Sequence, residues 1–131
     1  MLVIEGDHFA TLEEFYDEVE RVLIPGAAWG RNLDAFDDIL RGGFGTPEGG
    51  FVLLWRQSGR SSERLGYRET VRQLERRLTR CHPSNRGTVA EQLAQAKRGS
   101  GSTVFDWVVE IIRNHGPDGQ GAEDGVELRL E

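Results

Sequence analysis

Three aspartates stand close together in the segment WGRNLDAFDDIL, which spans residues 29–40 of the chain. Residues three and four apart lie on the same face of a helix, so Asp34, Asp37 and Asp38 are expected to cluster within about one turn. Carboxylates at this spacing repel each other by roughly a few tenths of a kcal/mol per pair. Such a cluster could serve acid–base catalysis, hold a divalent cation, or meet basic groups of a partner.

The catalytic and metal-binding alternatives lack the residues that would have to accompany the aspartates. His8, His82 and His115 lie in separate segments without the spacing of metal ligands, and Cys81 directly precedes His82, which is too close for a usual zinc-chelating pair. The glycine-rich loop RGGFGTPEGG, residues 41–50, lacks the G-K-[ST] ending of a P-loop and precedes a strand. We therefore predict no enzymatic activity, no metal and no cofactor.

Charge argues against nucleic acid as the main partner. The chain of 131 residues carries a net charge of −6, whereas phosphate binding needs a basic footprint. The arginine-rich segment 60–80 is interleaved with Glu63, Glu69 and Glu75, which favours a solvated helix held by salt bridges. A basic protein partner fits the charge, although a modest negative charge also serves solubility.

Composition and length predict one domain over residues 1–131, without disulfides. Cys81 is the single cysteine, which excludes an internal disulfide and is compatible with a reducing compartment. The N-terminus shows neither the basic region nor the long apolar region of a signal peptide, and no stretch approaches the ~20 apolar residues that span a bilayer. We expect a cytoplasmic, monomeric protein that does not bind membranes.

The first half of the chain predicts two helices between two strands. LVIE at residues 2–5 has the character of a short strand, and Thr11 with Glu14 has the form of a capping box that opens a helix. Asn32 is expected to cap a second, amphipathic helix that carries the aspartates. FVLLW at residues 51–55 is a continuous apolar run, which predicts a strand covered on both faces.

The second half predicts further helices and a last strand. Apolar residues at helical spacing between residues 67 and 78 indicate one helix, and a short polar helix is expected around residues 89–97. Thr103 is expected to cap an apolar, deeply buried helix, and VELRLE at 126–131 alternates as a half-exposed strand does. Strands separated by helices favour an α/β fold with a small parallel sheet.

One motif at residues 30–35 is more specific than these patterns. The sequence there is GRNLDA, and it is followed by Asp38 and Leu40, a loop, and an apolar strand that ends in WRQ at residues 55–57. This combination resembles the barstar family, cytoplasmic inhibitors of a secreted bacterial ribonuclease. The resemblance implies a three-stranded parallel sheet packed with helices. It covers roughly residues 2–57 and 103–130, and leaves 58–102 as a helical insertion between the second strand and the last helix.

The resemblance also implies how the aspartates act. In such inhibitors the second helix and the loop before it plug the active site of the ribonuclease, with carboxylates in the place of RNA phosphates. Carried over by position, Asp38 would be the main phosphate mimic and Asp34 the second anion. Gly30, Asn32 and Leu33 would form the contacting turn.

Further contacts follow from the same alignment. Trp29 stands where the family turn has an aromatic residue, and Asp37 replaces a residue that is often aromatic. Glu110 on the last helix lies nearest to an outer acidic contact of the family. Phe44, in the glycine-rich loop, could be either an interface anchor or a partly buried residue. Trp55, at the end of the apolar strand, is predicted to be a core residue.

The resemblance thus predicts an inhibitor of a basic, secreted ribonuclease. Two alternatives stay open: an immunity protein for a different toxin, and an interaction module without inhibitory function. An ordinary solvated helix face would also account for the three aspartates.

Overall fold

The computed structural model describes all residues from 1 to 131 and has an α/β fold. Its sheet contains β1 (Leu2–Glu5), β2 (Phe51–Arg56) and β3 (Val126–Leu130), paired in parallel in the order β1-β2-β3. The prediction of a small, three-stranded parallel sheet packed with helices is confirmed.

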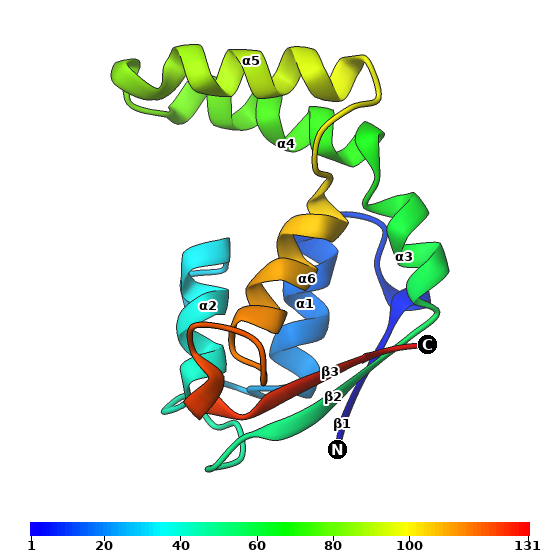
Figure 1. Cartoon of the computed structure of the whole chain (residues 1–131), viewed down its shortest axis with the longest axis vertical. Coiled ribbons are helices and arrows are strands. Elements are labelled where there is room, and N and C mark those ends of the chain that lie inside the picture. Colours follow the sequence, from blue (N-terminus) through cyan, green and yellow to red (C-terminus); the bar gives the residue numbers. More distant parts are fainter.

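The main helices lie on one side of this sheet (Figure 1). α1 (Leu12–Val22) and α2 (Leu33–Arg41) connect β1 to β2, and α6 (Val104–Asn114) leads into β3. Crossovers between parallel strands are almost always right-handed, so two successive crossovers that move across the sheet in the same direction place their helices on the same face. The strand order therefore dictates a two-layer molecule.

The prediction that β2 is covered on both faces is wrong. Phe51, Leu53 and Trp55 are buried under the helices, whereas Val52 and Leu54 on the other face are only half-buried. A continuous apolar run is usual for a strand between two helical layers. Here the one-sided crossovers leave the second face without a helical layer.

The main core fills the space between the helices and the sheet. Its cluster has 20 buried residues, and α2 contributes Phe36, Ile39 and Leu40 to it. Trp55 is fully buried and donates from its indole Nε1 to Ser61 Oγ over 2.9 Å, which confirms its prediction as a core residue. The apolar side of α2 is therefore fixed by the core, and its acidic side is left to face solvent.

The predicted helix starts are confirmed by their caps. Thr11 accepts from the backbone N–H of Glu14, Asn32 accepts from that of Ala35, and Thr103 forms a capping box with Asp106. The prediction of a deeply buried last helix holds for only part of α6, because Asp106, Glu110 and Arg113 form an exposed stripe.

The segment between β2 and α6 is helical, as predicted. It begins with α3 (Ser58–Arg64), which was not predicted because SGRSSER has no apolar periodicity. α4 (Tyr67–Arg80) and α5 (Arg86–Lys97) follow as an antiparallel hairpin, joined through the short turn η2 (Pro83–Asn85). The predicted polar helix thus starts earlier than expected, at Arg86.

The α4–α5 hairpin, residues 67–97, is called the arm below because it projects beyond the rest of the molecule, the body (Figure 1). It has its own small core, composed of Leu74, Val89, Leu93 and Ala96. Trp107 of α6 packs against both this cluster and the main core. Two further short turns, η1 (Gly6–His8) and η3 (Ala122–Asp124), lie in the body. No helix combines the length and the apolar character that crossing a membrane requires.

Candidate functional site

The turn that precedes α2 is held in one conformation by local contacts. Asn32 accepts from the N–H of Ala35 over 2.8 Å and donates from Nδ2 to the carbonyl of Gly30 over 3.3 Å. A Cβ on Gly30 would lie 3.1 Å from Asn32 Nδ2 and 3.3 Å from the Ala35 side chain, so a larger residue would crowd this cap. Arg31 adopts a left-handed φ of 51°, a conformation that non-glycine residues rarely keep without support.

That support comes from α1. Arg31 forms salt bridges with Asp17 and Glu20, and its Nη1 lies 3.0 Å from Glu20 Oε2. Its guanidinium also lies 6.0 Å from the centroid of the Trp29 ring. The turn predicted to contact a partner is thus tied to α1 before any partner is present, which reduces the entropy that binding would cost.

Asp34 and Asp38 are the exposed carboxylates of α2. Asp34 has no hydrogen-bond or salt-bridge partner, and it stands in the first turn, where the partial positive charge of the helix N-terminus favours an anion. Asp38 has a side chain that is 56% exposed, and Arg41 Nη1 lies 3.2 Å from its Oδ1. Both carboxylates are free to approach a cation on another molecule, because an exposed ion pair such as Asp38–Arg41 is weak.

The carboxylate of Asp37 is half-buried and is paired with other residues of the chain. Its Oδ2 lies 3.0 Å from Arg41 Nη2, and its Oδ1 lies 2.6 Å from Nε2 of His115, an imidazole that is almost fully buried. Nδ1 of His115 lies 2.6 Å from Asp124 Oδ2. Each ring nitrogen of His115 thus lies within hydrogen-bond distance of one carboxylate oxygen. Asp37 as a partner contact stays a prediction, and its bonds give it a structural role in addition.

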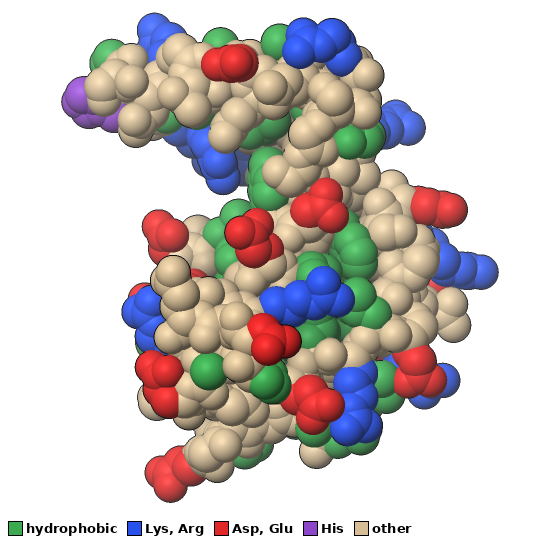
Figure 2. Space-filling view, viewed as in Figure 1, with side chains coloured by type: hydrophobic (Ala, Val, Ile, Leu, Met, Phe, Trp, Pro, Cys, Tyr) green, Lys and Arg blue, Asp and Glu red, His purple; other side chains and the backbone are tan.

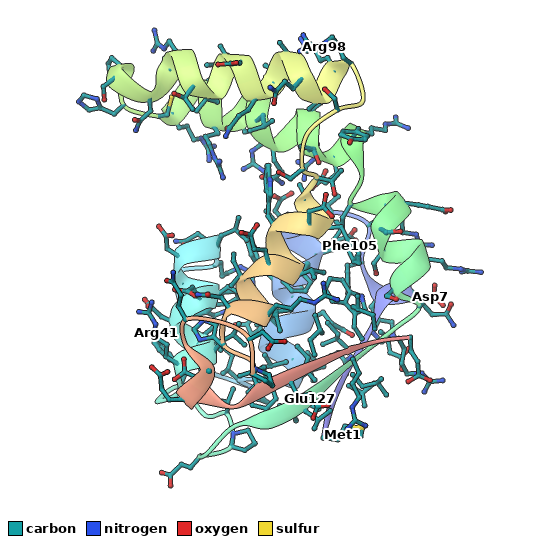
Figure 3. All side chains as sticks on the ribbon, viewed as in Figure 1. Met1, Asp7, Arg41, Arg98, Phe105 and Glu127 are labelled. Atoms are coloured by element: carbon teal, nitrogen blue, oxygen red, sulfur yellow. The ribbon has the colours of Figure 1, made fainter.

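The repulsion expected among the aspartates is therefore offset within the chain. Arg41 bridges Asp37 and Asp38 from the C-terminal end of α2, where its side chain lies on the outer side of the helix (Figure 3). His115 holds Asp37 from the end of α6. Asp34 alone keeps no counter-charge.

Two further predicted contacts flank the turn and help to anchor it. Trp29 is half-buried and packs edge-on against Tyr16, with ring centroids 5.5 Å apart, and its buried Nε1 has no hydrogen-bond acceptor. Leu33 is half-buried against the main core. Each therefore offers part of its surface to a partner while the other part holds the turn in place.

Phe44 and Glu110 lie in different places relative to α2. Phe44 follows the C-terminal end of α2 and is 41% exposed, which leaves it available as an anchor. Glu110 is exposed on α6, and it lines a groove of about 620 Å³ together with Asp37. Glu110 and Asp37 thus line the same groove, and the role of Glu110 as an outer contact stays a prediction.

Two residues that organise this surface, Arg41 and His115, were not predicted from the sequence. Arg41 could have been found, because it stands four positions after Asp37 and three after Asp38, the spacing of helical ion pairs. His115 gave no such signal, since it lies 78 positions from Asp37 and meets it only in the fold. No group of three or more His, Cys, Asp or Glu side chains is placed so that it could hold a metal ion.

Comparison with known proteins adds one match. A family model described as Barstar (barnase inhibitor) matches residues 1–92. This range contains β1, α1, α2 and β2 and ends within α5. It therefore includes every residue predicted to contact a partner except Glu110. A search of curated proteins gave no match.

Proposed function

The chain belongs to the barstar family, and we propose that it inhibits a ribonuclease by placing α2 and the preceding turn in the enzyme's phosphate-binding cleft. The family consists of ribonuclease inhibitors and not of enzymes. The finer proposal concerns this chain: Asp38 is the main phosphate mimic, Asp34 the second anion, and the turn around Gly30 and Asn32 the complementary contact.

One observation carries this proposal: Asp34 and Asp38 are exposed on a helix whose opposite face is fixed in the main core. A cleft that binds RNA phosphates must carry Arg or Lys groups, and carboxylates form charge-assisted hydrogen bonds with them, strongest where Arg binds as a fork. A rigid helix presents its carboxylates without loss of backbone entropy on binding. Inhibition then follows from occlusion, because RNA cannot enter the occupied cleft.

The charge of the surface also supports fast and selective association. Complementary potentials raise encounter rates and disfavour partners whose own charge is negative. Glu110, on the side of Asp37, would contribute to this long-range attraction from the edge of the contact. Phe44, Trp29 and Leu33 would supply apolar contact around the charges.

A different toxin as target is the second candidate, and Asp37 favours it. The family often has an aromatic residue at this position, whereas this chain has a carboxylate committed to His115 and Arg41. A changed residue in the middle of the contact surface indicates a changed target surface. The chain would then be an immunity protein for a toxin other than the family's usual ribonuclease.

A role in the cytoplasm of the producing cell completes the proposal, and a single cysteine suits such a reducing compartment.

The test is an inhibition assay on a panel of small, secreted microbial ribonucleases at low salt. Wild type is compared with Asp38→Ala and with the matched control Glu127→Ala, an exposed carboxylate on β3 that is paired only with Arg129. Truncating one partner of a buried charge pair costs about 2–5 kcal/mol, a range established in part on the barnase–barstar complex itself. We expect Asp38→Ala to weaken inhibition about 30-fold or more and the control to leave it unchanged. Absence of inhibition by wild type throughout the panel would contradict the ribonuclease target.

A further inference from the structure

A cleft of about 440 Å³ separates the arm from the turn and the first residues of α2. Asn32, Leu33 and Asp34 line it on the body side, and the arm contributes side chains from the second half of α4. Figure 2 shows this hollow, with basic side chains on the underside of the arm and acidic ones across from them. Any protein that docks on the N-terminal end of α2 therefore also meets the arm.

The arginines on this side of α4 differ in how far they are neutralised. Arg72 and Arg76 form salt bridges with Glu13, and Arg72 also pairs with Glu69. Arg77 stacks over the ring of Trp107, with its guanidinium carbon 5.3 Å from the centroid, and has no carboxylate partner. Arg80 is exposed and has no partner within the chain. Two uncompensated positive charges thus face the cleft.

The arm is held firmly at its base, so these charges keep their place. The buried carboxylate of Glu69 accepts from the N–H of Leu12 over 2.8 Å, which ties α4 to the start of α1. The N–H of Val104 donates to the hydroxyl of Thr70 over 2.9 Å, which ties α4 to the start of α6. Burial alone would raise the pKa of Glu13, but hydrogen bonds from Arg72 and Gln73 outweigh it, so the pKa of Glu13 is lowered.

Charge is divided sharply between the two regions. The arm, residues 67–97, contains seven Arg or Lys against three Glu and so carries a net charge of +4. The rest of the chain contains nine basic and nineteen acidic residues, for a net charge of −10. The net charge of −6 is therefore the sum of a basic arm and an acidic body, and the arm lies across the cleft from the acidic helix.

We propose that the underside of the arm, with Arg77 and Arg80, is a second binding surface that takes an acidic segment of the protein bound to α2. This inference rests on the proposed function for the identity of the bound protein. It adds which charged side chains that protein presents to this chain. The partner presents a basic cleft to Asp34 and Asp38, and acidic side chains on the rim of that cleft nearest the arm. The arm would thereby select among ribonucleases that share a basic active site.

A protein carboxylate fits this cleft better than a nucleic acid does. Asp34 forms part of its wall, and the body around it carries the net charge of −10, so a chain of phosphates would be repelled along most of its length. A short acidic segment needs only the guanidinium groups of Arg77 and Arg80, which have no carboxylate partner within the chain and can bind carboxylates as a fork. Its neighbouring basic residues would be attracted to Asp34.

The experiment is a titration of the full chain with the peptide Lys-Glu-Glu-Lys, blocked at both ends, followed by the NMR signals of the arginine Nε–H groups and the backbone amides at low salt. We expect the signals of Arg77 and Arg80 to shift, and Arg80→Gln together with Arg77→Gln to weaken binding at least about 5-fold, as expected for the loss of two exposed charge contacts. The matched control is Arg98→Gln with Arg113→Gln, two exposed arginines outside the cleft. The spectra themselves report whether each variant is folded.

Three results would overturn the inference. The double variant could bind the peptide as wild type does, the shifts could map to Arg98 and Arg113, or hexauridylate could bind the cleft more tightly than the peptide. The peptide titration decides the arm's preference even if no ribonuclease is inhibited. With an inhibited ribonuclease, Arg80→Glu should weaken inhibition about 10-fold, as a repulsive contact replaces an attractive one. If Asp38→Ala abolishes inhibition while Arg80→Glu leaves it unchanged, the proposed function stands and the role of the arm fails.

Discussion

The acidic helix and the basic arm are built in opposite ways. α2 buries one side in a core of 20 residues, and its carboxylates stand on the outside of that rigid support. The arm has a core of only four buried residues and depends on polar contacts at its base. A binding surface can thus be fixed either by burial beneath it or by anchoring at one end. Burial beneath α2 places its carboxylates precisely. Anchoring at one end allows the sequence of the arm to change without disturbing the packing of the body.

The largest expected effect distinguishes the two kinds of core. Phe36→Ala removes a fully buried ring beneath the aspartates and should cost about 3–5 kcal/mol of unfolding free energy. Leu74→Ala should cost about 2–3 kcal/mol, because the small cluster of the arm can collapse more easily around the change. Urea unfolding followed by tryptophan fluorescence measures both. Amide exchange should show the loss from Leu74→Ala within the arm. Equally accelerated exchange in α2 would show that the two regions are one cooperative unit.

The next effect concerns the joint between the regions. Glu69→Ala leaves the N–H of Leu12 without its acceptor and removes a partner from Arg72, so we expect a loss of about 1–3 kcal/mol and faster amide exchange in α4. Glu75→Ala is the matched control, because Glu75 is exposed on the same helix. Unchanged exchange in α4 after Glu69→Ala would mean that the arm is held by its apolar contacts alone.

Acid should weaken the body through Glu18. Burial alone would raise the pKa of Glu18, but the N–H of Glu5 and the side chains of Arg21 and His8 outweigh it, so its pKa is lowered from the ordinary 4.5. The folded chain then keeps this charge to lower pH than the unfolded chain does. Its contribution to stability is present above about pH 4.5 and is lost as pH falls through the lowered pKa.

The measurement is the urea midpoint as a function of pH between 7 and the acid range. Glu18→Gln should lower stability at neutral pH and flatten the decline in acid. A variant that declines as steeply as wild type would assign the acid sensitivity to other groups, such as Glu13 at the base of the arm, whose pKa is also lowered.

The smallest effect concerns Arg41, which neutralises the acidic face from within. Arg41→Ala should change unfolding free energy by less than about 1 kcal/mol, because the side chain is largely exposed. Affinity for an inhibited ribonuclease should rise a few-fold, since Asp38 no longer shares its charge. Arg129→Ala, which breaks an exposed pair on β3, is the control. Weaker binding of Arg41→Ala would show that Arg41 itself touches the partner.

Local features of the sequence predicted most of the fold and the main site helix. Asn32 caps α2, Thr103 caps α6, and the apolar spacing predicted the buried sides of α1, α2 and α4. Caps and helical periodicity depend only on residues that are close in sequence, so they can be predicted without knowledge of the tertiary structure. The one-sided cover of β2 was not foreseen, because an apolar run does not reveal on which side the crossovers pass.

Contacts between distant segments could not be predicted. His115 meets Asp37 only because the end of α6 lies beside α2, and no sequence pattern marks that contact. The helices of the arm were predicted from their spacing, but their place above the N-terminus of α2 follows from Glu69 and Thr70 at its base. The charges of the two regions can be counted in the sequence. That the basic arm faces the acidic helix across a cleft could be learned only from the structure.

The most direct test of the central claim is an amide-exchange footprint of the chain with and without a ribonuclease that it inhibits. The account predicts slowed exchange over residues 29–38 and at the end of α4 near Arg80, with β3 unchanged. Slowed exchange confined to other surfaces, with residues 29–38 unprotected in the complex, would contradict the claim that the acidic helix is the inhibitory surface.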